Sequence, residues 1–210
     1  ISPCLVGSEM CIRDRYDMDV VDMIASSCTN IARGELQQFN HIGDLTTTPE
    51  DHYSIIDGKT VGPFATGTAC AALVAGASKE VSDMMYDFGT EFGRAFQLVD
   101  DLLDLTGDPE MGKPRGTDVH EGKMTLPIIH ALTILHGSER EHLADVLNNF
   151  SDDRWNELTT LLEISGSFSY TRQLIQNHVD RALEIISNLP SSDAKDLISE
   201  VALISRNRKV

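Results

Sequence analysis

The hydrophobic residues recur with a helical period along almost the whole chain from residue 16 onward. Over the stretch 17–42 they keep one face apolar for about six helical turns. The pattern stops at Gly43 and the threonines that follow it. It predicts a first helix over 17–42, with an apolar stripe made of Val20, Val21, Ile24, Cys28, Ile31, Ala32, Leu36 and Phe39.

Residues that favour helix ends divide the next part of the chain. Thr48 followed by Pro49 is typical of a helix start, because threonine caps the first turn and proline needs no amide donor there. This second helix should reach Gly62 and Pro63, where we predict a break. The stretch 63–77 is rich in alanine, which favours a helix packed closely on its neighbours.

A long helix of about 27 residues follows Ser78, and we predict that it is central because helices average only ~11–12 residues. The stretch 106–123 contains four glycines and two prolines without an apolar period, which indicates a loop. No strand pattern competes with these helices. The predicted fold class is therefore all-α, a multi-helix bundle, with further helices over 125–136, 138–149, 152–163, 168–189 and 192–207.

Composition narrows the function classes. The 210 residues fit one domain, and the net charge of −16 disfavours nucleic acid as a partner. No apolar run reaches the ~18 residues of a transmembrane segment. The four cysteines form no C-x-x-C pair, which is typical of a reduced, cytoplasmic protein. We interpret 1–15, which lacks any period, as a non-native segment ahead of a helical domain over 16–210.

Three carboxylates share one stripe near the end of the long helix. Asp100, Asp101 and Asp104, together with Gln97, fall within an arc of roughly 100°. Like charges at this spacing repel by about 0.2–0.5 kcal/mol per pair, so the cluster needs a cation or full solvation. Oxygen ligands of this kind favour Mg²⁺, and a solvated acidic face is the alternative.

Cations follow these carboxylates in a glycine-rich segment. Lys113, Arg115 and Lys123 lie there, and Lys59 and Thr60 lie at the expected break between two helices. Lysine suits phosphate oxygens, and a divalent metal can bridge carboxylates to a diphosphate. The combination indicates a diphosphate site, although each lysine alone could serve only solubility.

These motifs resemble, in order and spacing, the C-terminal half of the trans-isoprenyl diphosphate synthases, or polyprenyl synthetases. The resemblance covers about 17–210 and rests on the stretches 34–38, 53–60, 96–104, 112–118 and 122–127. It implies an isoprenoid-synthase α-bundle around a central cavity, a homodimer in the full-length protein, and Mg²⁺ as cofactor. The implied reaction is head-to-tail condensation of an allylic prenyl diphosphate with isopentenyl diphosphate, which releases diphosphate.

The resemblance also implies the site residues. The metal-binding carboxylates would be Asp100, Asp101 and Asp104, and the diphosphate-binding lysines would be Lys59, Lys113 and Lys123. Catalysis would involve Thr60 and Gln97 near the reacting carbon, with Lys59 and Lys123. The released diphosphate would take the proton, so no histidine is assigned a catalytic role.

Parts of the family pattern are missing from the sequence. A first aspartate-rich motif, the arginine pair after it and a Gly-Lys-Arg stretch are absent. We therefore expect an N-terminally truncated bundle that is inactive by itself, from which product length is not readable. Alternatives are a related class I terpenoid synthase, whose second metal motif differs, a noncatalytic subunit of a heteromeric synthase, and a purely structural bundle. The noncatalytic subunit ranks second, because such subunits tend to lose the aspartates present here.

Overall fold

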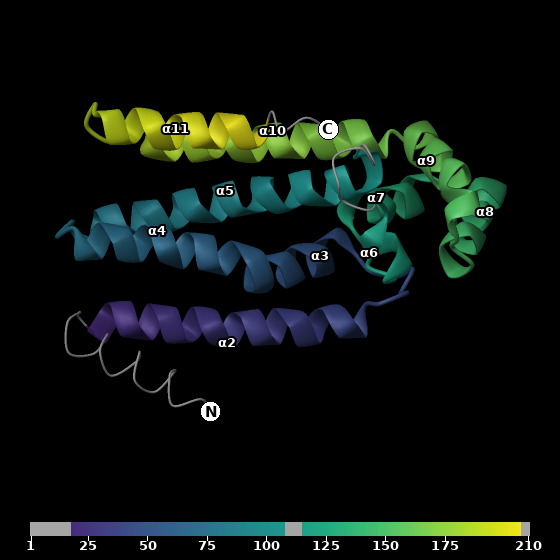
Figure 1. Ribbon diagram of the computed structural model, residues 1–210, viewed down its shortest axis with the longest axis horizontal. Helices are drawn as coiled ribbons and strands as arrows, with labels where there is room; N and C mark the ends of the chain where they lie inside the picture. Colours follow the sequence, from purple (N-terminus) through teal and green to yellow (C-terminus); the bar gives the residue numbers. More distant parts are fainter. Residues whose placement is uncertain (1–17, 108–114, 207–210) are drawn as a thin grey trace.

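A computed structural model describes residues 18–107 and 115–206, and this part of the chain is helical with no strand (Figure 1). The predicted all-α class is confirmed. The elements in chain order are α2 (Met18–Asn40), α3 (Pro49–Ile56), η1 (Asp57–Val61), α4 (Gly62–Val74), α5 (Lys79–Thr106), α6 (Thr117–His120), α7 (Leu126–Ile134), α8 (Gly137–Asn148), η3 (Asp152–Arg154), α9 (Trp155–Ile164), α10 (Ser167–Ser187) and α11 (Asp193–Arg206).

The long helix α5 is central, as predicted. It has 28 residues, starts where the Ser78 side chain accepts from the Val81 amide, and packs on α4 and α10. Figure 1 shows α5 between the layer of α2 and the layer of α10 and α11, with α6 to α9 gathered at one end. The site-bearing end of α5 therefore lies where the layers meet this second group of helices.

Glycines in α5 allow α4 and the end of η1 to approach closely. A Cβ added at Gly89 would lie 2.6 Å from the Cα of Ala65, and one at Gly93 would lie 3.0 Å from the Cα of Val61. Ala65 and Ala69 of α4 are fully buried against this face. The alanine-rich stretch thus forms the closely packed helix that its composition predicted.

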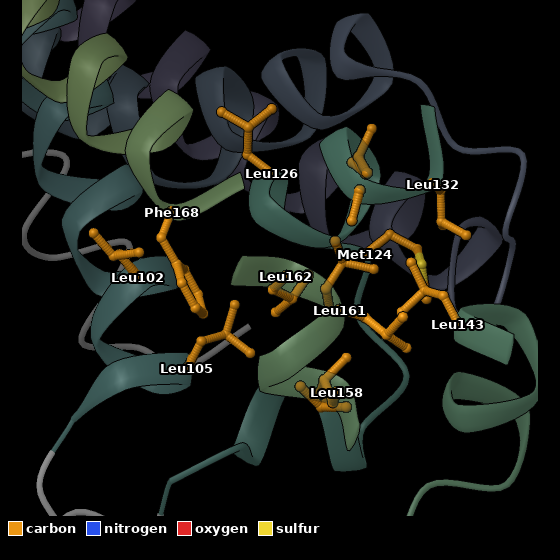
Figure 2. Close-up of a cluster of buried hydrophobic side chains, with 14 of the residues drawn as sticks. Leu102, Leu105, Met124, Leu126, Leu132, Leu143, Leu158, Leu161, Leu162 and Phe168 are labelled. Atoms are coloured by element: carbon orange, nitrogen blue, oxygen red, sulfur yellow. The ribbon is translucent and has the colours of Figure 1, made fainter. Parts of the chain in front are cut away.

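The larger hydrophobic core lies around the C-terminal half of α5. Figure 2 shows Leu102 and Leu105 of α5 facing leucines of α7 and α9 and Phe168 at the start of α10. Leu102, Leu126 and Leu162 are completely buried. This core fixes the C-terminal end of α5 against the segment that carries Lys123.

The predicted break at residues 62 and 63 is wrong. The chain stays helical through the π-helix η1, where the Gly62 amide donates to the Asp57 carbonyl, and continues into α4. Pro63 is the second residue of α4, so the amide that proline lacks is missing at the junction of η1 and α4 and not in the interior of either helix. The Thr48 cap is confirmed as a capping box with Asp51.

The predicted loop over 106–123 contains one short helix, α6, so that expectation is only partly right. Gly116 turns the chain with a φ of 73°, and the Asp104 carboxylate accepts from the amides of Thr117 and Asp118. A side chain distant in sequence thus supplies the acceptors that the first turn needs.

Of the predicted apolar stripe of α2, only Val20 is buried. Val20, Ser27 and Gly34 are buried, whereas Leu36 and Phe39 are 67% and 68% exposed. Gly34 explains the choice, because an added Cβ would lie 2.8 Å from the Lys59 amide nitrogen. Small residues allow α2 to approach η1, and this contact sets its rotation.

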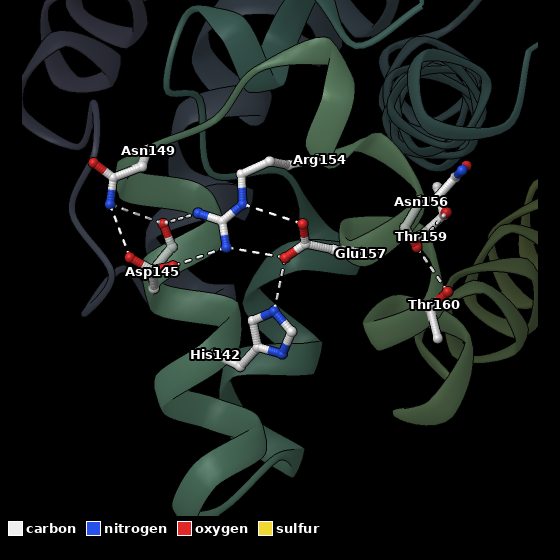
Figure 3. Close-up of polar contacts among 8 residues, drawn as sticks. All are labelled: His142, Asp145, Asn149, Arg154, Asn156, Glu157, Thr159 and Thr160. Carbon is white, nitrogen blue, oxygen red and sulfur yellow. Dashed lines mark hydrogen bonds and ion pairs between the residues drawn. The ribbon is translucent and has the colours of Figure 1, made fainter.

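Ion pairs join the outer helices α8 and α9. The Arg154 guanidinium lies 2.8 Å from a carboxylate oxygen of Asp145 and 3.0 Å from one of Glu157, which also contacts His142 (Figure 3). No helix within the described ranges combines the length and apolar character needed to cross a membrane.

Candidate active site

A cavity of about 170 Å³ lies between α2, α3, η1, α5 and the segment 118–125. It brings together most of the residues that the sequence singled out. Its lining includes Lys59, Thr60, Gln97, Asp100, Asp101 and Lys123. Asp104 is not among the lining residues, and Lys113 lies outside the described residues.

The π-helix positions two of these side chains. The Lys59 ammonium lies 2.9 Å from a Glu35 carboxylate oxygen and donates to the Gln38 side-chain oxygen at 2.8 Å. Glu35 and Gln38 belong to α2, which lies close to η1 because Gly34 has no side chain. The stretch 34–38 therefore serves the site by orienting Lys59.

A continuous chain of polar contacts links η1 to α5. The Thr60 hydroxyl donates to Gln97 Oε1 at 2.8 Å, and Gln97 Nε2 donates to Asp101 Oδ1 at 2.8 Å. Asp101 is only 2% exposed, and its Oδ2 lies 3.2 Å from Nε2 of the buried His52. Neither of these last two atoms has a hydrogen-bond partner in the described part of the chain.

Asp104 is engaged elsewhere. Its two oxygens accept from the amides of Thr117 and Asp118 at 3.0 and 3.1 Å. Burial, and then the neighbouring Asp118 carboxylate, raise the pKa of Asp104 to about 6. Within 18–107 and 115–206, no three histidine, cysteine, aspartate or glutamate side chains gather closely enough to hold an ion.

Lys123 faces the cavity from the opposite wall. Its ammonium lies 2.8 Å from Asp118 Oδ1 and 2.7 Å from Glu121 Oε2. Although burial acts to lower it, the hydrogen bonds to these two carboxylates raise the pKa of Lys123 well above its ordinary value. Lys123 is therefore a fixed positive charge at neutral pH.

Sequence reasoning assigned no role to Asp118 or His52, yet both line the cavity. Asp118 lies five residues before Lys123 in the glycine-rich segment, and this spacing was a signal that could have found it. His52 carries no comparable signal, because only the tertiary placement of α3, which packs on α2, η1 and α7, brings it to Asp101.

Comparison with known proteins identifies the family. The sequence model described as polyprenyl synthetase matches residues 5–163. The chain belongs to the polyprenyl synthetase family. It is 31% identical over 185 residues to the short chain isoprenyl diphosphate synthase of Methanothermobacter thermautotrophicus, a match covering 88% of this chain and 57% of that protein. It is 32% identical over 196 residues to the octaprenyl diphosphate synthase of Escherichia coli, covering 91% and 60%.

Solved structures of polyprenyl synthetases confirm the isoprenoid-synthase fold. The polyprenyl synthase of Caulobacter crescentus superposes with a TM-score of 0.88 at 28% identity, covering 95% of this chain and 62% of that one. A decaprenyl diphosphate synthase from Rhodobacter capsulatus gives 0.87 at 29% identity, covering 94% and 62%. The chain thus spans about three-fifths of the length of these relatives.

The family match begins at residue 5, inside the segment that we interpret as non-native. Residues 1–17 lie outside the described part of the chain, so that interpretation stays a prediction. The individual roles of the site residues likewise stay predictions.

Proposed function

We propose that this chain carries the allylic-diphosphate site of a prenyltransferase that condenses an allylic prenyl diphosphate with isopentenyl diphosphate. The observation that carries the proposal is the shared cavity, where Asp100 and Asp101 of α5 face the same space as Lys59 and Lys123. Carboxylates and ammonium groups around one small cavity suit a metal-bound diphosphate better than a neutral ligand.

The donor chemistry of the cavity fits Mg²⁺. Asp100, Asp101 and Asp118 are hard oxygen donors on its wall, and the buried Oδ2 of Asp101 has no hydrogen-bond partner among the described residues. Mg²⁺ is commonly held by one or two carboxylates plus phosphate oxygens, so a closed protein cage is not required. Asp104 stays in the predicted set, but it would have to release its two amide contacts to reach an ion.

The residues of the cavity account for the proposed chemistry. A bound Mg²⁺ would stabilise the charge that develops on the departing diphosphate. Lys59 and Lys123 would bind the diphosphate oxygens as the carbon–oxygen bond breaks to leave an allylic cation. Thr60 and Gln97 line the same cavity and would present oxygen atoms near that carbon. The isopentenyl double bond then forms the new carbon–carbon bond, and a proton passes to the released diphosphate.

A family member supports this ligand class. The Caulobacter crescentus polyprenyl synthase was crystallised in complex with calcium and isoprenyl diphosphate. A divalent cation and a prenyl diphosphate are therefore the ligands that we propose here. The homodimer implied by the family resemblance and the cytoplasmic location indicated by the cysteine pattern are part of the same proposal.

Calorimetry with Mg²⁺ and inorganic diphosphate tests the site in the chain as it stands. We expect binding only when both are present, and a loss of at least tenfold in Lys59→Met, since a hydrogen bond to a charged group contributes about 1.5–3 kcal/mol. Lys79→Met is the matched control, because Lys79 is exposed and, among the described residues, forms its ion pair with Asp83 of its own helix. Equal affinity in all three proteins would contradict the proposal.

A turnover assay separates catalysis from binding. Condensation of an allylic diphosphate with isopentenyl diphosphate would favour the enzyme, whereas Mg²⁺-dependent binding without product is what a noncatalytic subunit or an inactive portion predicts. A structural bundle predicts neither binding nor product.

A further inference from the structure

The buried contact between His52 and Asp101 has no role in the chemistry described above. His52 is 5% exposed, Asp101 is 2% exposed, and their Nε2 and Oδ2 atoms lie 3.2 Å apart. Within the described residues each atom lacks a hydrogen-bond partner, so each has the other as its polar neighbour. Burying two such atoms is costly unless they serve each other or a ligand.

The start of α3 explains why His52 reaches this position. The Thr48 and Asp51 capping box with Pro49 fixes the first turn of the helix. His52, Ile55 and Ile56 then share one face, and all three are buried. The two isoleucines anchor α3 in the protein interior and leave the imidazole directed at α5.

Asp101 connects His52 to Gln97 and Thr60, which line the same cavity. A carboxylate can only accept, so Asp101 Oδ1 selects the Nε2 end of the Gln97 amide and leaves Oε1 to accept from Thr60. The amide orientation of Gln97 therefore depends on where the Asp101 carboxylate is held. His52 is the group that meets its other oxygen.

We infer that His52 is a positioning residue, which fixes the Asp101 carboxylate and through it the Gln97 amide and the Thr60 hydroxyl. The effect on ligand binding rests on the proposed function, because it concerns Asp101 as a metal-facing group. Outer-shell groups that orient a metal-ligating side chain typically change metal affinity 10–100-fold when they are lost.

Calorimetry with Mg²⁺ and inorganic diphosphate gives the first test. We expect His52→Leu and His52→Met to weaken binding about 10–100-fold, and His52→Gln, which keeps an N–H donor, to restore most of it. The matched control is His178→Leu. His178 of α10 is equally buried and lies 2.6 Å from Glu91, which belongs to α5 as Asp101 does. His178 lines a different cavity. Equal affinities in the wild type and both apolar His52 variants would overturn the inference.

The side-chain amide of Gln97 gives a second test that needs no metal. In the metal-free wild type we expect a slowly exchanging amide proton by ¹⁵N NMR, since Nε2 donates to Asp101. In the apolar His52 variants this signal should shift and exchange faster, and in His178→Leu it should not change. An unchanged signal in the His52 variants refutes the inference, whether or not the proteins bind Mg²⁺. If no protein binds Mg²⁺ but the signal changes as expected, only the proposed function is refuted.

Discussion

At the scale of single residues, the three carboxylates near the end of α5 differ in what they contact. Asp100 lines the cavity, Asp101 is buried between Gln97 and His52, and Asp104 accepts from the backbone of α6. Helical spacing predicted their common stripe correctly. It could not predict that His52 of α3 meets Asp101 or that the amides of α6 meet Asp104, because tertiary packing brings these groups to α5.

Asp104 gives a pH dependence that can be measured without metal. Burial is the main reason that its pKa is raised from the ordinary value of 3.8 to about 6. The folded state therefore binds the proton more tightly than the unfolded state, and stability falls as the pH rises from about 4 to about 6. We expect Asp104→Asn to flatten this decline in urea unfolding over that range. A decline as steep as in the wild type would contradict the assignment, and Asp153→Asn, at an exposed site on η3, is the control.

At the scale of elements, local signals located the helices and tertiary contacts set the details. Capping residues placed the starts of α3 and α5 where the sequence predicted them. The π-helix η1 and the short α6 were not foreseen, because close packing on Gly34 and acceptance by Asp104 decide them. These two elements carry or flank Lys59, Thr60 and Asp118, so the unforeseen parts of the fold lie at the site itself.

The contact between α4 and α5 can be tested at its glycines. Alanine is favoured over glycine inside a helix by about 1 kcal/mol, but at Gly89 the new Cβ would lie 2.6 Å from the Ala65 Cα. We expect Gly89→Ala to lower the free energy of unfolding by about 1–3 kcal/mol, because backbone cannot yield cheaply. Gly67→Ala is the control, since nothing lies within 4 Å of its added Cβ, and it should be neutral or stabilising. Equal effects at both positions would show that the packing is looser than described.

At the scale of the whole molecule, exposed apolar side chains at the end of α2 lie beside the candidate site. Leu36, Phe39 and Ile42 are 67%, 68% and 45% exposed. Phe39 and Ile42 border a second cavity of about 440 Å³ that also reaches Lys59 and Lys123. Exposed apolar patches of this kind mark surfaces that associate with other molecules. The sequence pattern predicted the stripe, but not its exposure, because rotation of α2 is set by its small residues.

This surface predicts how the chain behaves in solution. Leu36→Ser combined with Phe39→Ser removes apolar area that is already in water, so the free energy of unfolding should change by no more than about 0.5 kcal/mol. Self-association, measured by sedimentation velocity over a concentration series, should fall because the area available for association is smaller. Ile55→Ser, at a position 5% exposed, should instead lose about 2–5 kcal/mol of stability. A comparable loss of stability in the double variant would contradict this prediction. It would mean that other residues of the chain cover Leu36 and Phe39 in solution.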